Sequence, residues 1–87
     1  MKIEYSKGFI KDLKNASQGI KDNLKERLKI FVVNKYHPIL NNHSLSGKLK
    51  HYRSINVSGD WMAIFQEIKK EDACYFTAIG SHSKLYY

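Results

Sequence analysis

Hydrophobic residues in the first part of the chain recur at steps of three and four, the spacing of an amphipathic helix. After residues 2–6, whose alternation suits a short strand, two such stripes follow, over residues 9–16 and 20–32. Pro38 disfavours helical backbone at the residue before it, so the second helix should end by His37. The pattern predicts a strand followed by a helical hairpin with one apolar side and one basic side.

The period of the pattern changes after a polar loop at residues 39–50. Residues 51–57, 61–68 and 73–80 have the apolar runs and alternation of strands, and the breaks between them, "SGD" and "KKED", have turn chemistry. Strands joined by tight turns pair antiparallel. The predicted fold is therefore α+β in the order β-α-α-β-β-β, with the helical hairpin packed on a small antiparallel sheet. The length allows one domain, over residues 1–87.

The net charge of +7 belongs to the first half of the chain. Through Lys50, eleven Lys and Arg residues stand against four acids, whereas from His51 onward four stand against four. A basic face of this kind favours a polyanion such as nucleic acid, an anionic membrane or an acidic protein partner. Solvated surface lysines explain the same charge without a partner, so charge alone does not choose among these.

The cysteine content and the N-terminal sequence indicate a reducing compartment. The single Cys74 lies in an apolar run, so we expect a buried thiol and no internal disulfide. The first residues lack the apolar segment of a signal peptide, and no run is long enough to span a membrane. The histidines lack the spacing of metal ligands. We therefore expect a cytoplasmic protein with no membrane partner, no metal and no small-molecule cofactor.

Candidate chemistry gathers at one rim of the predicted sheet. Asp60 and Trp61 begin one strand, and His82 follows the next strand, which runs antiparallel to it. Antiparallel neighbours bring the start of one strand to the end of the other, so Asp60 and His82 should lie close together. A carboxylate can orient a histidine as a general base, and an arginine can bind a phosphate. Arg53, on an apolar strand face, is the candidate for that second role.

An acid, a base and a cation without a metal suit RNA cleavage in which a ribose 2′-hydroxyl attacks the adjacent phosphate. An exposed Trp61 or Tyr86 can stack on an unpaired base. Simpler interpretations stay open for each residue. His82 is also explained as a surface histidine near the chain end, Asp60 as a hairpin-turn residue and Trp61 as part of the core.

Four short motifs, in order along the chain, resemble those of a known group of proteins. They are "NHSLSG" in the loop, "YR" at a strand start, "DW" at the opening of the next strand and "GSHSKLYY" at the end. The segment from His43 to Tyr86 thereby resembles the RelE/ParE superfamily of toxins, and within it the YafQ/RelE-type ribosome-dependent mRNA endonucleases. The predicted strand–helix–helix order upstream agrees with the fold of that superfamily.

The resemblance implies a toxin of a type II toxin–antitoxin system. Such a toxin is an endoribonuclease, or mRNA interferase, that inhibits translation by cutting mRNA on the ribosome, and a cognate antitoxin protein neutralises it. By position, His82 is then the leading acid–base residue, assisted by Asp60, and His43 shares proton transfer or contacts phosphate. Arg53 matches a basic position suited to phosphate binding. Further substrate contacts are expected from Trp61, Tyr86, Lys48, Lys50 and Asn56.

Two positions depart from the YafQ-type pattern, which has a histidine at position 56 and an arginine at position 78. Asn56 cannot exchange a proton, and Ala78 cannot stabilise a charged phosphorane. These departures keep open a homologue without catalysis that only binds antitoxin or RNA. A ParE-like inhibitor of DNA gyrase, which needs no His–Asp pair, is the other alternative.

Overall fold

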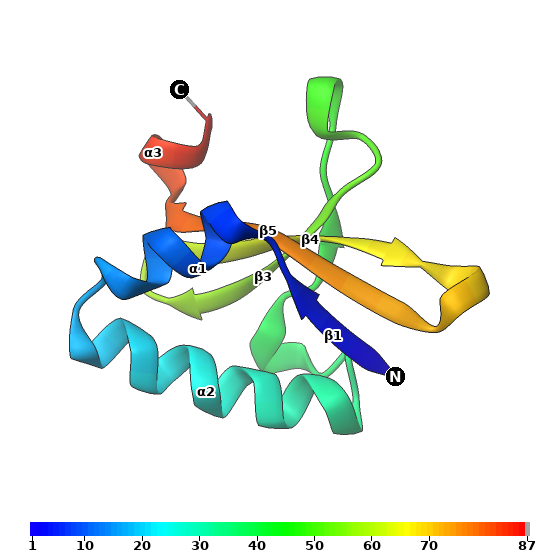
Figure 1. The fold of residues 1–87 in the computed structure, drawn as a ribbon, viewed down its shortest axis with the longest axis horizontal. Helices are drawn as coiled ribbons and strands as arrows, with labels where there is room; N and C mark the ends of the chain where they lie inside the picture. The colour runs from blue at the N-terminus through cyan, green and yellow to red at the C-terminus, as the bar shows by residue number, and fades with distance from the viewer. Residues whose placement is uncertain (87) are drawn as a thin grey trace.

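A five-stranded sheet forms the centre of the fold in the computed structural model, which describes residues 1–86 (Figure 1). The strands lie in the order β1-β5-β4-β3-β2. Their bounds are β1 Lys2–Tyr5, β2 His43–Ser44, β3 Arg53–Ser58, β4 Trp61–Ile68 and β5 Ala73–Ser81. The helices are α1 Lys7–Lys14, α2 Gln18–Val33 and α3 His82–Tyr86, and short 3-10 turns are η1 Pro38–Leu40, η2 Gly47–Leu49 and η3 Lys69–Glu71.

The helical hairpin of α1 and α2 covers one face of the sheet, as the sequence predicts (Figure 1). Each helix begins at a serine N-cap: the Ser6 hydroxyl accepts the N–H of Phe9 at 3.0 Å, and the Ser17 hydroxyl accepts that of Ile20 at 3.2 Å. Helix α2 ends at Val33, inside the limit that Pro38 sets. No helix within residues 1–86 is long and apolar enough to cross a membrane.

Buried aromatic rings fill the space between the hairpin and the sheet. The Phe31 ring of α2 meets Phe65 of β4 edge-on, with ring centres 5.2 Å apart, and Phe76 of β5 at 5.6 Å. Phe9 of α1 lies 5.8 Å from Phe76. Burying one such side chain stabilises the fold by about 1.5–3 kcal/mol. The predicted burial of Cys74 is confirmed, since this residue is 2% exposed.

The direction of β1 corrects one prediction. Strands β3, β4 and β5 form the predicted antiparallel meander, but β1 pairs with β5 in parallel, from Lys2 opposite Ala73 to Tyr5 opposite Phe76. The sheet is therefore mixed and not antiparallel. A four-residue edge strand has no tight turn that fixes its direction, so its pattern could not show this. The two-residue β2 and the five-residue α3 were also not predicted, because both are too short to show a period.

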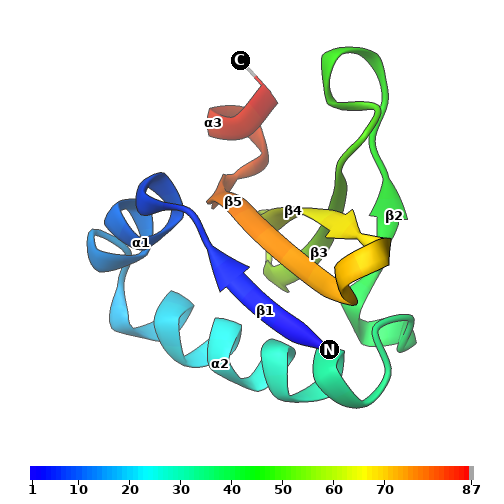
Figure 2. The same ribbon diagram turned by 45° about the vertical axis from the view of Figure 1, so that its right-hand side comes forward.

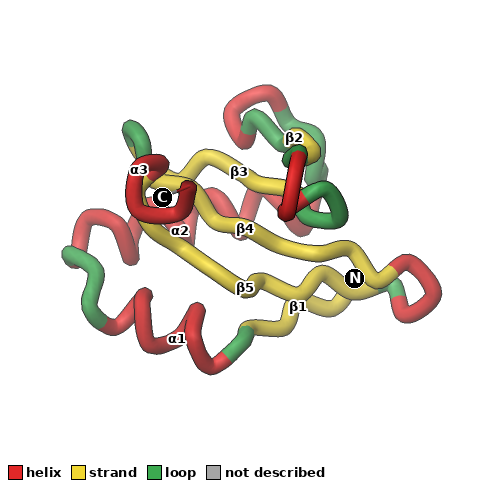
Figure 3. Tube along the Cα trace, turned by 90° about the horizontal axis from the view of Figure 1, so that it is seen from above, coloured by secondary structure: helices red, strands yellow, loops and turns green. Residues whose placement is uncertain are grey.

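The second face of the sheet is open between two projections. Helix α3 and the segment 44–52 both rise on the side away from α2 (Figures 1 and 2). Seen from above, α3 lies over one end of the meander, and β2 lies beyond β3 (Figure 3). Two rows of paired residues cross β3, β4 and β5 on this open face: Asn56, Met62 and Gly80, then Ser54, Ile64 and Ala78. The predicted site residues gather beside these rows.

Candidate active site

Asp60 and His82 lie together at one rim of the sheet, as the antiparallel order predicts. Trp61 pairs with Ser81, and the backbone N–H of His82 donates a hydrogen bond of 2.8 Å to the carbonyl oxygen of Asp60. Gly59 takes a left-handed backbone with φ of 54°, which the turn between β3 and β4 requires. Within residues 1–86 the Asp60 carboxylate and the His82 ring form no hydrogen bond with each other, so the backbone holds the pair together.

A cavity of about 330 Å³ joins these two residues to others predicted for the site. Its lining includes His43, Asn56, Asp60, Trp61, His82 and Tyr86. Tyr86 also lines an adjoining hollow of about 410 Å³, together with Lys48 and Leu85. Lys50 is exposed at the end of η2 and lines neither space within the described chain. Most of the predicted residues therefore meet in one place.

The hydrogen bonds of His43 define which ring nitrogen can take up a proton. Its Nδ1 lies 2.7 Å from the carbonyl oxygen of Asn41, and its Nε2 lies 3.5 Å from the hydroxyl of Ser54. A carbonyl oxygen only accepts hydrogen bonds, so this contact assigns the hydrogen of the neutral ring to Nδ1. The lone pair is then on Nε2, and His43 is arranged as a proton acceptor.

Helix α3 brings the rings of His82 and Tyr86 together. These residues are four apart, and their ring centres lie 4.6 Å from each other at an interplanar angle of 51°. The Ser81 hydroxyl accepts the N–H of Lys84 at 3.2 Å, which fixes the start of the helix. Burial raises the pKa of the Tyr86 phenol, so this side chain stays neutral at neutral pH. The pair offers a proton-exchanging ring beside a stacking ring.

Trp61 and Asn56 have structural roles in addition to lining the cavity. Trp61 packs against the buried core cluster, so the core interpretation and the site interpretation both apply to it. The amide nitrogen of Asn56 donates to the carbonyl oxygen of Gly59 at 3.1 Å, which supports the turn that carries Asp60. Asn56 therefore has one end of its amide committed to the turn.

Sequence reasoning did not identify Ser54 or Met62, which also line the cavity. Ser54 is 1% exposed and faces the ring of His43. The alternation along β3 could have found it, because Ser54 shares the open face with Asn56. Ala78, paired with Ile64, lies in the same row as Ser54. Within the described chain, neither Lys nor Arg lines the cavity.

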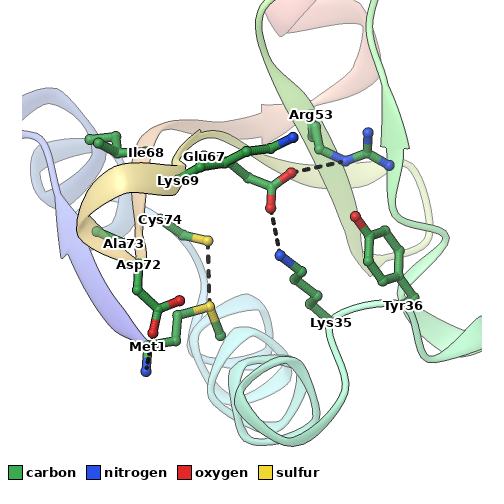
Figure 4. Close-up of a pocket in the computed structure, with 10 residues that line it drawn as sticks. All are labelled: Met1, Lys35, Tyr36, Arg53, Glu67, Ile68, Lys69, Asp72, Ala73 and Cys74. Atoms are coloured by element: carbon green, nitrogen blue, oxygen red, sulfur yellow. Dashed lines mark hydrogen bonds and ion pairs between the residues drawn. The ribbon is translucent and has the colours of Figure 1, made fainter.

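Arg53 does not join this group. Strand alternation puts it on the opposite face from Ser54, where its side chain, 26% exposed, lies 3.9 Å from the carboxylate of Glu67. It lines a separate hollow of about 410 Å³ (Figure 4). Arg53 thus shares the apolar face of β3 with Ile55 and Val57, and this face points away from the cavity. No three His, Cys, Asp or Glu side chains within residues 1–86 are grouped so as to hold a metal ion.

A helical hairpin on one face of a mixed sheet is the fold of the RelE/ParE-like toxins. The YoeB/ParE toxin from Agrobacterium tumefaciens has this fold: it superposes with a TM-score of 0.78 over 94% of this chain and 99% of its own. At 9% sequence identity that likeness shows the fold alone.

A family model described as "Bacterial toxin of type II toxin-antitoxin system, YafQ" matches residues 1–87. The chain therefore belongs to the YafQ family of toxins of type II toxin–antitoxin systems. The crystal structure of YafQ from E. coli strain BL21(DE3) is similar at 29% identity, with a TM-score of 0.77 over 98% of this chain and 97% of that one.

Two further solved structures support the family. In the E. coli DinJ–YafQ toxin–antitoxin complex, the matched chain is 30% identical, with a TM-score of 0.74 over 98% of this chain and 96% of that one. A metal-bound toxin from Helicobacter pylori is 30% identical, with a TM-score of 0.73 over 99% of both chains. A comparison with curated proteins found no match.

Proposed function

We propose that this toxin is an endoribonuclease that inhibits translation by cutting mRNA on the ribosome. One observation carries the proposal: His43 from β2 and His82 from α3, far apart in the sequence, line one cavity together with Asp60. Two imidazoles at one site can accept and donate protons near neutral pH. The cytoplasm, where ribosomes lie, is the proposed place of action.

The proposed reaction needs no metal. One imidazole accepts the proton of a ribose 2′-hydroxyl while that oxygen bonds to the adjacent phosphorus. The bond from phosphorus to the 5′-oxygen breaks, and the second imidazole donates its proton to the leaving oxygen. The products are a 2′,3′-cyclic phosphate and a 5′-hydroxyl. His43 suits the role of base because its Nε2 has the free lone pair, and His82 is then the acid.

Aromatic and basic side chains beside the histidines suit the binding of mRNA. Trp61 and Tyr86 offer ring faces for unpaired bases, and stacking of this kind contributes about 1–3 kcal/mol per base. Tyr86 lies between the cavity and the adjoining hollow, and Lys48 lies in that hollow. Lys48 and Lys50 are the proposed phosphate contacts, because the cavity itself is lined by neither Lys nor Arg within the described chain.

The same lack of a lining cation favours a second candidate function, a homologue that binds antitoxin or RNA and cuts slowly or not at all. Because Asn56 and Ala78 carry no charge, stabilising the developing phosphorane is left to Lys48 and Lys50. A slow enzyme would still show some cleavage that is lost when His43 or His82 is replaced, whereas a homologue without catalysis would show none.

Purified toxin, ribosomes and one defined mRNA test the proposal. Wild type should produce ends with a 5′-hydroxyl, and His82→Ala and His43→Ala should each slow cleavage by about 10²- to 10⁴-fold. His51→Ala is the matched control, since His51 is exposed and does not line the cavity. Undiminished cleavage by His82→Ala would contradict the proposal. Double-strand DNA breaks on expression, with both histidine variants still toxic, would instead indicate a ParE-like gyrase inhibitor.

We further propose a cognate antitoxin as the protein partner, because the similar YafQ chain from E. coli forms a complex with DinJ. An apolar groove of about 300 Å³ between α1 and α2 suits an amphipathic acidic segment of such a partner. Most of its lining residues are apolar and two are lysines: Tyr5, Phe9, Ile10, Leu13, Leu24, Leu28, Lys21 and Lys25. Ile10 is 47% exposed, although it lies on the apolar stripe of α1.

Binding of the antitoxin encoded beside the toxin gene tests this groove. Ile10→Glu should weaken binding at least about tenfold through an unfavourable charge in an apolar contact, and should leave mRNA cleavage unchanged. Val33→Glu is the control, because Val33 is 86% exposed and lies outside the groove. Equal antitoxin affinity for both variants would place the interface elsewhere.

A further inference from the structure

The residue before His43 is held by contacts from two other parts of the chain. The side-chain nitrogen of Asn42 donates to the carbonyl oxygen of Lys35 at 2.8 Å, and its side-chain oxygen accepts from Nε of Arg53 at 2.8 Å. Nη2 of Arg53 also donates to the backbone oxygen of Asn42 at 3.5 Å. A carbonyl only accepts and a guanidinium only donates, so one orientation of the amide satisfies both contacts.

Arg53 is itself held in place by partly buried neighbours (Figure 4). Its guanidinium lies 5.7 Å above the centre of the Tyr36 ring and 3.9 Å from the carboxylate of Glu67. The second oxygen of Glu67 accepts from Nζ of Lys35 at 2.6 Å, and the Glu67 side chain is 16% exposed. A carboxylate that is mostly shielded from water, as that of Glu67 is, keeps its cationic partners close. Lys35, Asn42, Arg53 and Glu67 therefore form one connected unit, called the Asn42 network below.

The Asn42 network is connected to His43 through the peptide that joins Asn41 to Asn42. Asn41 has a left-handed backbone with φ of 45°, and its carbonyl oxygen lies 2.7 Å from Nδ1 of His43. That carbonyl is bonded to the nitrogen of Asn42, so the plane of the peptide turns whenever Asn42 moves. A fixed position of Asn42 therefore also fixes the carbonyl oxygen of Asn41, which contacts Nδ1 of His43.

We propose that Arg53 and Asn42 are positioning residues that select the tautomer of His43. They hold the Asn41 carbonyl against Nδ1, so the hydrogen stays on Nδ1 and the lone pair of Nε2 is available to accept a proton. The neutral side chain of a free histidine prefers the opposite form, with hydrogen on Nε2. The catalytic consequence rests on the proposed RNA cleavage, whereas the tautomer is a property of the toxin alone. Arg53 then acts through His43 and touches no phosphate.

A second histidine provides an internal reference. Nδ1 of His37 accepts the backbone N–H of Ile39 at 3.1 Å, which requires the lone pair on Nδ1 and the hydrogen on Nε2. His37 and His43 should therefore be opposite tautomers within one molecule. The His37 contact is made within its own turn, to Ile39, whereas the His43 contact is to the carbonyl joined to Asn42.

Nitrogen-15 NMR of the histidine rings tests the proposal at a pH of about 8, where an ordinary histidine is neutral. In wild type, the shifts should show hydrogen on Nδ1 for His43 and on Nε2 for His37. Asn42→Ala and Arg53→Lys should move His43 towards the Nε2–H form and leave His37 unchanged. Asn23→Ala, at an exposed position of α2, is the control. Arg53→Lys keeps the positive charge, so it serves if Asn42→Ala does not fold. An unchanged His43 tautomer in folded variants would overturn the proposal.

Cleavage of ribosome-bound mRNA separates this proposal from the proposed function. Asn42→Ala and Arg53→Lys should slow cleavage by about 10- to 100-fold, the scale of a displaced catalytic group. Neither should slow His43→Ala any further, since both act through that ring. Variants that change the tautomer and cut at the wild-type rate would overturn the positioning role. The wild type could instead cut no RNA, while His37 and His43 show opposite tautomers and the variants change that of His43. This result would refute the nuclease proposal and support the tautomer selection.

Discussion

The backbone N–H of His82 donates a 2.8 Å hydrogen bond to the carbonyl oxygen of Asp60. This bond continues the pairing of β4 with β5 by one step beyond Trp61 and Ser81, and α3 begins at the same residue. The backbone of Asp60 therefore fixes the position of the His82 backbone. The carboxylate of Asp60 takes no part in this contact and lines the cavity as a negative charge. The backbone contact of Asp60 and its proposed chemical role therefore belong to different atoms.

Asp60→Asn separates those two functions. The substitution keeps the carbonyl that His82 contacts and removes only the negative charge. We expect the melting temperature to change little, and cleavage to slow by less than the loss for His82→Ala, which removes a proton-exchanging group. Rates of mRNA cleavage and a thermal melt check this. A loss as large as that of His82→Ala would show that the carboxylate itself exchanges the proton.

Gly80 allows α3 to pack closely on the open face of the sheet. A Cβ atom at this position would lie 3.3 Å from Cδ2 of Leu85, tighter than ordinary van der Waals contact. Gly80→Val should therefore displace α3, cost about 1–3 kcal/mol of stability and slow cleavage by about 10- to 100-fold, because His82 and Tyr86 move with the helix. Rates measured well below the melting temperature separate displacement of α3 from unfolding.

The matched glycine control is Gly19→Ala in the first turn of α2. A Cβ there meets only the hydroxyl of Ser17, at 3.9 Å. Alanine should stabilise the helix by about 0.5–1 kcal/mol and leave cleavage unchanged. Wild-type cleavage by folded Gly80→Val would show that the position of α3 does not matter.

The Lys35–Glu67 pair gives stability a measurable pH dependence. The hydrogen bond to Glu67 raises the pKa of Lys35 above its ordinary value of 10.5. The folded state thus binds this proton more tightly, so the contribution is complete below that value and is lost as the pH rises through the raised pKa. Urea unfolding from about pH 9.5 to about 11.5 should show the free energy of unfolding of wild type falling towards that of Glu67→Gln. Lys35 is 35% exposed, so the difference should be about 1 kcal/mol or less.

Both proteins in that comparison should carry Cys74→Ala. Burial raises the pKa of the Cys74 thiol, so this group also lowers the stability at alkaline pH. Removing it from both leaves Lys35 as the difference between them. A stability difference that stays constant across the whole pH range would contradict the assigned role of the pair.

Tight turns explain why the sequence predicted the meeting of Asp60 with His82. The tight turns at residues 59–60 and 69–72 make β4 antiparallel to its neighbours, so the start of β4 meets the end of β5 despite a register shift between Ile64 and Phe65. Strand alternation put Arg53 on the apolar face, and the cavity lies on the other face. Arg53, the sequence candidate for phosphate binding, therefore lines a different hollow from the one that His43 and His82 line.

Other features depend on contacts that leave no local pattern. Asn42 meets Lys35 seven residues away and Arg53 eleven residues away, and an asparagine in a polar loop gives no sign of either contact. Helix α3 has five residues, too few for an amphipathic period. The parallel direction of β1 follows from how the hairpin of α1 and α2 returns the chain to the sheet. Such features could not be predicted from the sequence, because they depend on the packing of segments that are distant along the chain.

In the proposed reaction, the cavity of His43, Asp60 and His82 cuts RNA by attack of a ribose 2′-hydroxyl. An mRNA with a single 2′-deoxynucleotide on the 5′ side of the scissile phosphate isolates this step, since only the attacking oxygen is removed. With wild-type toxin on programmed ribosomes, cleavage at that bond should disappear, while the unmodified message is cut to a 2′,3′-cyclic phosphate and a 5′-hydroxyl. Cleavage of the modified message at the same bond and the same rate would contradict the mechanism.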